Sequence, residues 1–194
     1  MAVIIEDSME DVFMPVRKEV LGLKDKLGRA IDPGILELVV ALRFHGVHTI
    51  SSCEGHADRT TSGPYVMFEA PETHDFRRRY REAKDKKSTE YRHWHNKAVQ
   101  ANVPEVRRVL GLLADFYEHR LSPNDQHIIV RSFDASVGEL ICQGAEIARI
   151  LPAAERELLL QKNRAEMQAF TDYLKLRPLT PSADGREGVL QRSD

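Results

Sequence analysis

Residues 32–56, DPGILELVVALRFHGVHTISSCEGH, predict a helix that leads directly into a strand and then into a group of reactive side chains. Asp32 is a favoured N-cap residue, and the proline after it suits the first helical position, where its missing N–H has no helical partner. Apolar residues then recur at helical spacing until Gly46, so we expect a helix over 33–45. A short strand over 47–51 follows at once.

The hydrophobic patterns on either side extend this unit into an α+β protein. Residues 64–70, PYVMFEA, have the composition of a second strand, and we expect it to pair antiparallel with the first, with CEGH at the mouth of their connection. HIIVRSF (127–133) and GELICQG (138–144) predict a second strand pair, although 139–150 also fits a helix. Further helices are predicted over 74–101, from Pro104 to the SPND turn, and over 152–176.

We therefore expect an α+β fold with a mostly antiparallel sheet of about four strands and helices on one of its faces. A single domain would span 1–177, with 74–121 as a helical insertion, and the polar residues 178–194 would form a disordered tail. Before residue 28 we expect a short helix that Pro15 interrupts. The last helix is amphipathic, and its spacing fits both the core of the chain and a homodimer interface.

The composition is that of an ordinary globular protein. The chain has 194 residues, of which 42% are hydrophobic and 30% charged, and its formal net charge is −2. The net charge of the whole chain therefore does not indicate a nucleic-acid or membrane partner. The N-terminus carries acids where a signal peptide would carry lysines, and two cysteines do not make a disulfide framework in a chain of this length. These features predict a cytoplasmic protein with reduced thiols.

The segment CEGH (53–56) combines the residue types of a metal site. Cys53 and His56 have the C-x-x-H spacing that a tight turn can bring to one zinc ion, and Gly55 with a positive φ would supply the bend. A closed zinc site needs two further ligands, and no spacing decides between the candidates. These candidates are His45, His48, Asp58, His93 and His95, the last two about 200° apart on a helix.

The same residues also suit a catalytic thiol. Cys53 would act as nucleophile, His56 as base, and Glu54 as an acid/base or orienting group, although the partners in such triads generally come from distant segments. A third explanation is structural, with Cys53 as a small buried hydrophobe like Cys142. Because strand-end loops are where sites concentrate, we expect a functional site here.

Residues 74–97 form a basic segment, with nine Lys or Arg against four Asp or Glu. Such a helix, over 76–97, can bind the phosphates of RNA or of a nucleotide, and Arg77 and Arg78 are the first candidates. Interleaved aromatic residues would be available for base stacking, namely Phe76, Tyr80 and Tyr91. Acidic residues at four-residue spacing also permit a solvated helix with internal ion pairs.

The stretch from Ile31 to Phe68 resembles the opening of the tRNA wybutosine-synthesising methyltransferase family, in which an S-S-C-S-G-R run follows a similar helix. It also resembles small uncharacterised bacterial proteins that carry an S-C-E-G-H run. The resemblance implies an α+β fold and a nucleotide or S-adenosylmethionine ligand in a pocket around Ser51, Ser52, Cys53 and Gly55. This chain departs from the family at Glu54 and His56, which replace a serine and an arginine, so a titratable ring stands where the family has a fixed cation.

Overall fold

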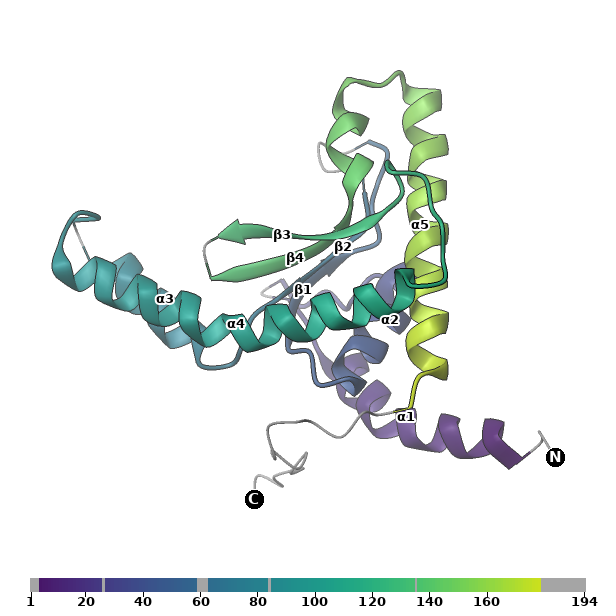
Figure 1. The fold of residues 1–194 in the computed structure, drawn as a ribbon, viewed down its shortest axis with the longest axis horizontal. Coiled ribbons are helices and arrows are strands. Elements are labelled where there is room, and N and C mark those ends of the chain that lie inside the picture. The colour runs from purple at the N-terminus through teal and green to yellow at the C-terminus, as the bar shows by residue number, and fades with distance from the viewer. Residues whose placement is uncertain (1–3, 26, 59–62, 84, 135, 179–194) are drawn as a thin grey trace.

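The computed structural model describes residues 4–25, 27–58, 63–83, 85–134 and 136–178, with side chains from residue 11 onward except at 133 and 134. The predicted α+β fold is confirmed (Figure 1). A four-stranded antiparallel sheet has the strand order β1-β2-β4-β3. Its strands are β1 (Thr49–Cys53), β2 (Tyr65–Phe68), β3 (Ile128–Asp134) and β4 (Val137–Cys142).

The described part of the chain also contains five α-helices and one 3₁₀-helix. They are α1 (Ile4–Gly22), α2 (Pro33–Phe44), α3 (Thr73–Glu82), α4 (Thr89–Tyr117), the 3₁₀-helix η1 (Gln143–Ile150) and α5 (Ala153–Leu176). The open choice at 139–150 is thereby decided, because β4 continues to Cys142 and only the residues after it are helical. None of these helices combines the length and the apolar character needed to cross a membrane. The predicted tail lies, beyond residue 178, outside the described residues.

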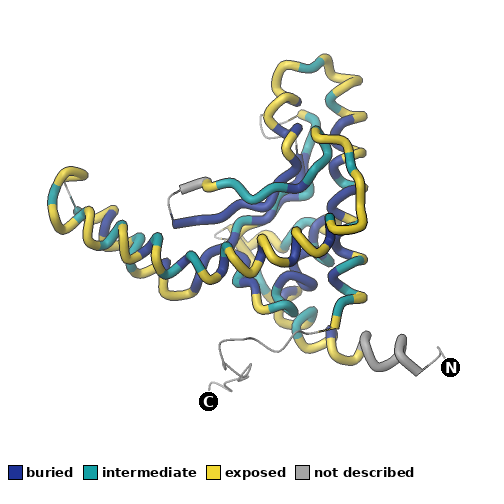
Figure 2. The backbone as a smooth tube through the Cα atoms, viewed as in Figure 1, coloured by how far each residue is buried: buried dark blue, intermediate teal, exposed yellow. Residues whose placement is uncertain are grey.

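One face of the sheet carries the hydrophobic core (Figure 2). Side chains alternate between the two faces of a strand, so every second residue of β2 and β4 points into this core. They meet α2, the C-terminal half of α4, and the part of α5 around Phe170. The predicted amphipathic last helix contributes Met167, Phe170 and Leu174 to this core. Leu159 and Leu160 of the same helix are also buried, while Leu158 stays half exposed.

Gly138 is the place where the two central strands pack most closely. It pairs with Phe68 across β2 and β4, and the Phe68 side chain is completely buried. A Cβ at position 138 would lie far inside van der Waals contact with the Phe68 ring. The ring has no room to move because the surrounding core is closely packed.

We therefore expect Gly138→Ala to lower the free energy of unfolding by about 1–3 kcal/mol, the usual cost of overpacking a core. Gly111→Ala on α4 is the matched control, because a Cβ there meets nothing within 4 Å. In a helix that change should stabilise by roughly 0.5–1 kcal/mol. Urea unfolding measures both, and equal midpoints for Gly138→Ala and the parent protein would contradict the packing argument.

Two prolines that we expected to interrupt or to open helices lie inside them. Pro15 is inside α1, so the prediction of a short interrupted helix is wrong. The Phe13 ring stacks on Phe44 of α2, with ring centroids 4.0 Å apart, and such packing outweighs the one lost hydrogen bond. Pro104 is inside α4, where the buried residues Asn102 and Glu105 anchor the helix on both sides of it.

The basic segment predicted as one helix over 74–101 is two helices. Chain reversal between α3 and α4 produces a helical arm that projects from the sheet (Figure 1). The Asp85 carboxylate accepts from the N–H of Lys87 at 2.8 Å, and the Ser88 hydroxyl caps α4 by accepting from the N–H of Tyr91 at 3.1 Å. Local side-chain hydrogen bonds of this kind compete with a continuous helix.

Candidate metal centre

The loop after β1 brings the two predicted ligands together. Gly55 has a φ of 80°, which confirms the predicted left-handed bend. The bend turns His56 back toward the N-terminus of α2, where Asp32 lies. His56 Nε2 is 3.8 Å from the nearer carboxylate oxygen of Asp32, Oδ2.

Asp32, Cys53 and His56 each direct one possible ligand atom at the same point. These three atoms lie within 4.8 Å of one another, and they are the only such group of three or more among the described residues. A tetrahedral zinc ion, with bonds of roughly 2.0–2.3 Å, separates its ligand atoms by about 3.5 Å. Small side-chain movements therefore suffice to close the three donors around one ion. The third donor is a residue that the sequence suggested only as a helix cap.

The hydrogen bonds of Asp32 and Glu54 differ from those that the sequence predicted. Asp32 occupies the N-cap position of α2, but its side chain makes no capping hydrogen bond. Its carboxylate instead accepts from the N–H of Glu54 at 3.3 Å, and the Glu54 carboxylate accepts from the N–H of Gly34 at 2.8 Å. A Cβ on Gly34 would lie 2.6 Å from that carboxylate, so a side chain at position 34 would displace it from its present place. Glu54 thus caps α2 from the end of β1, and its acid/base or orienting role stays a prediction.

Removing this long-range cap should cost stability. We expect Glu54→Ala to lower the free energy of unfolding by about 1 kcal/mol, the usual value of an N-cap. Glu54→Gln keeps an acceptor oxygen and should lose less. Denaturant unfolding of the three proteins tests this order, and an unchanged midpoint for Glu54→Ala would show that the contact does not stabilise α2.

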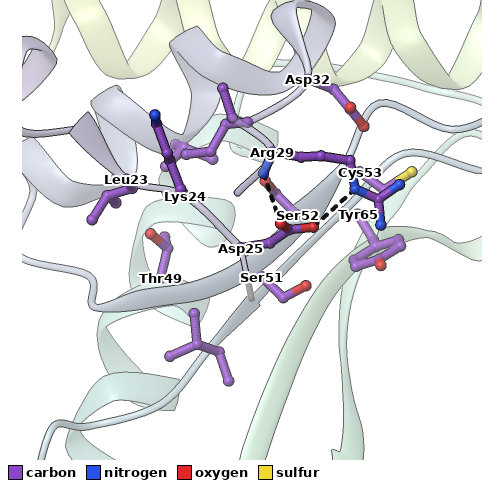
Figure 3. Close-up of a pocket in the computed structure, with 14 residues that line it drawn as sticks. Leu23, Lys24, Asp25, Arg29, Asp32, Thr49, Ser51, Ser52, Cys53 and Tyr65 are labelled. Carbon is purple, nitrogen blue, oxygen red and sulfur yellow. Dashed lines mark hydrogen bonds and ion pairs between the residues drawn. The ribbon is translucent and has the colours of Figure 1, made fainter. Parts of the chain in front are cut away.

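A groove of about 360 Å³ runs along β1, and two of the three donors, Asp32 and Cys53, line it (Figure 3). All five residues of β1 line it, because β1 is an edge strand and its outer side faces the connection between α1 and α2. The strand also contains a register shift between Thr49 and Ser51, the kind of bulge that proteins use to re-aim side chains near sites. Asp32 and Cys53 both belong to the lining, so the candidate metal position opens onto this groove.

The opposite wall of the groove is a turn held by Asp25. The Asp25 carboxylate accepts from the N–H groups of Leu27 and Arg29, both at 2.8 Å, and from the Arg29 side chain at 3.2 Å (Figure 3). These bonds, above all the one from the Arg29 N–H, lower the pKa of Asp25. Across the groove, burial and then the nearby Cys53 raise the pKa of Tyr65. Tyr65 therefore keeps its proton at neutral pH and can donate a hydrogen bond into the groove.

No protein-family model matches this chain, and neither does any curated protein or solved structure. The resemblance of residues 31–68 to the wybutosine-synthesising family and to the S-C-E-G-H proteins stays a prediction. It implies a pocket around four residues of the strand end. Ser51, Ser52 and Cys53 line the groove, whereas Gly55 is buried in the loop outside its lining and its carbonyl accepts from Arg164 of α5 at 2.7 Å.

The histidines considered as further ligands serve other contacts. His45 Nε2 lies 2.8 Å from the carbonyl of Leu174, joining the ends of α2 and α5, and burial there lowers the pKa of His45. His48 bonds to the carbonyl of Glu69 at 3.0 Å. His93 and His95 pack in the arm, against Trp94 and against Tyr80 and Tyr91 respectively.

The two cysteines differ in their surroundings, since Cys142 lies in the core and Cys53 borders the groove. Neither forms a disulfide. Cys142 is a core residue, as predicted, and burial raises the pKa of its thiol to about 12, which makes it a poor nucleophile. Cys53 is 9% exposed, borders the groove and lies within 4.8 Å of both a carboxylate and an imidazole.

The arginines proposed as ligand-binding residues lie away from this site, in the arm. The Arg77 guanidinium makes two contacts of 3.1 and 3.0 Å with Glu69, whose own pKa is raised by burial. Arg77 therefore anchors the arm to the end of β2. The side chain of Arg78 is 60% exposed, with Asp75 at 3.4 Å, and is open to solvent.

Proposed function

We propose that this protein binds one zinc ion through Asp32, Cys53 and His56 and acts with it on a small polar substrate held in the β1 groove. A single observation carries the proposal: three donors converge within 4.8 Å, and two of them also line a groove. Structural zinc sites are usually closed by four protein ligands, whereas catalytic sites use three and leave a position for water or substrate. Three donors beside a groove fit the second pattern.

The donor set suits zinc better than the hard cations. A thiolate, an imidazole and a carboxylate are all common zinc ligands, while calcium and magnesium prefer oxygen alone. When bound, such an ion supplies Lewis acidity toward a carbonyl or phosphoryl oxygen. A thiol ligand must stay reduced, which agrees with the cytoplasmic location that the sequence predicts.

The groove provides the means to orient a substrate. Its volume of about 360 Å³ is within the range of small-molecule sites and accommodates a ligand of nucleotide size. Tyr65 and the hydroxyls of Ser51 and Ser52 supply hydrogen bonds along β1. Lys24 supplies positive charge on the facing wall, where the charge of Arg29 is paired with Asp25. This arrangement supports the nucleotide-like substrate class predicted from the sequence.

Metal content tests the proposal directly. Protein purified without a histidine tag should contain about one zinc ion per chain by elemental analysis. Cys53→Ala, His56→Ala and Asp32→Ala should each weaken zinc binding by more than the roughly 10–100-fold that loss of an outer hydrogen-bond partner costs. Cys142→Ala and His93→Ala, which remove the same residue types elsewhere, should keep their zinc.

Two results would contradict this function in different ways. A zinc-free protein that cannot be loaded, combined with rapid alkylation of Cys53, would favour the catalytic thiol. Acetohydroxamate changes the visible spectrum of a cobalt-substituted site when it can bind the metal. An unchanged spectrum would therefore mean that the site is closed and the metal structural. In the alkylation measurement Cys142 serves as an internal reference, because its thiol is buried and resists ionisation.

A second candidate function, contact with RNA, is favoured by the exposed cations of the arm. Arg78, Arg79 and Arg92 are exposed, and the arm projects from the body of the protein (Figure 2). The aromatic rings expected to stack on bases are instead used inside the arm, where Phe76 stacks on Trp94 with centroids 6.0 Å apart and Tyr80 packs on Tyr91. Phosphate contact without base stacking is therefore the form of RNA binding that the arm supports.

Salt dependence of tRNA binding tests this second function. We expect Arg78→Gln/Arg92→Gln to weaken binding and to reduce the slope of log affinity against log salt by up to about 1.8, because each lost phosphate contact removes roughly 0.7–0.9. Lys18→Gln/Lys162→Gln removes the same charge from α1 and α5 and should leave the slope unchanged. Equal slopes for the two double variants would exclude the arm as the binding surface.

A further inference from the structure

We infer that two arginines of α5, Arg164 and Arg156, fix the loop that carries His56 and so set the metal affinity of the site. The inference rests on the proposed zinc function and deepens it, because it assigns residues that position a ligand without touching the ion. Both arginines are far from the loop along the chain, because their contacts join residues that are 110, 109 and 99 positions apart.

Arg164 holds the first half of the loop. Its Nε donates to the carbonyl of Glu54 at 3.0 Å, and its Nη2 donates to the carbonyl of Gly55 at 2.7 Å. The same guanidinium lies 3.7 Å from the Glu54 carboxylate that caps α2. A planar guanidinium that donates to two successive carbonyls fixes the orientation of the peptide between them. A lysine ammonium, which lacks this planar geometry, cannot do so.

Arg156 holds the other side of His56. Its Nη1 donates to the carbonyl of Ala57 at 3.0 Å, and its Nη2 donates to the carbonyl of Leu151 at 3.2 Å, just before α5. His56 is thus bracketed by three carbonyls, two before it and one after it, that all accept from α5. The two arginines are eight residues apart, about two helical turns, so one face of α5 carries both.

Apart from these arginines, the loop is held by the hydrogen bonds of Glu54 to the start of α2. The structure shows no backbone–backbone hydrogen bond between residues 54–57 and any other described residue. The N–H of Glu54 bonds to the Asp32 carboxylate, which is itself a proposed ligand. The arginines therefore limit the conformations from which His56 can reach the ion, and pre-organisation of this kind raises affinity by reducing the ordering cost of binding.

The test compares zinc affinity with loop mobility in full-length protein. Competition with a chelator should show zinc binding about 10–100-fold weaker in Arg164→Gln, the range typical for residues that orient metal ligands. Arg164→Lys, which can reach only part of this geometry, should recover some of the loss. Lys162→Gln is the control, an exposed cation two residues away on the same helix, and should bind zinc like the parent protein.

Hydrogen exchange of the metal-free proteins supplies an independent measurement. In Arg164→Gln the amides of residues 54–57 should exchange faster, while those of the buried part of α5 should not change. If the parent protein binds zinc and Arg164→Gln binds it equally well, the arginine does not position the ligand, although the metal site itself stands. If the parent protein binds no zinc, the proposed function fails and with it the effect on affinity. Unchanged exchange at 54–57 would overturn the fixing of the loop in either case.

Discussion

The pair of hydrogen bonds between the N-terminus of α2 and the end of β1 is the interaction on which the site depends. Asp32 accepts from the backbone of Glu54, and Glu54 accepts from the backbone of Gly34. Two segments that the chain separates by about twenty residues are thereby fastened at the point where a strand ends and a helix begins. These bonds hold Asp32 beside Cys53 and His56, so one pair of contacts determines both the start of the helix and the composition of the candidate metal site.

The sequence predicted the elements well wherever their signals are local. Helix 33–45 and the strands around it follow from apolar periodicity and from Gly46, which has a φ of 76° as a helix-ending glycine should. The prolines misled us because their cost is also local, whereas the packing of Phe13 and of Asn102 that outweighs it is tertiary. The break between α3 and α4 did carry a local signal, in the Asp85 and Ser88 side chains, that the basic character of the segment obscured.

Only part of the candidate site could be predicted from the sequence, because some of its residues come together only in the folded chain. Cys53, Gly55 and His56 form a short motif whose geometry a single bend decides, and that bend was foreseen. Asp32 could not be identified as a partner, because its side chain fits an N-cap equally well and only the pairing of β1 with its surroundings brings it close. Nothing in the sequence indicates that Arg164 contacts the loop, since an arginine on an amphipathic helix usually faces solvent. Its role arises from where α5 lies in the fold.

The arginines of α5 bind carbonyl oxygens, a group that every residue of the loop possesses. Their hold on the loop is consequently indifferent to which side chains the loop presents. Position 56, which lies between these carbonyls, can then exchange imidazole for another side chain while the backbone that orients it stays in place. In evolutionary terms the side chains of the candidate site can vary independently of the fold that supports the loop.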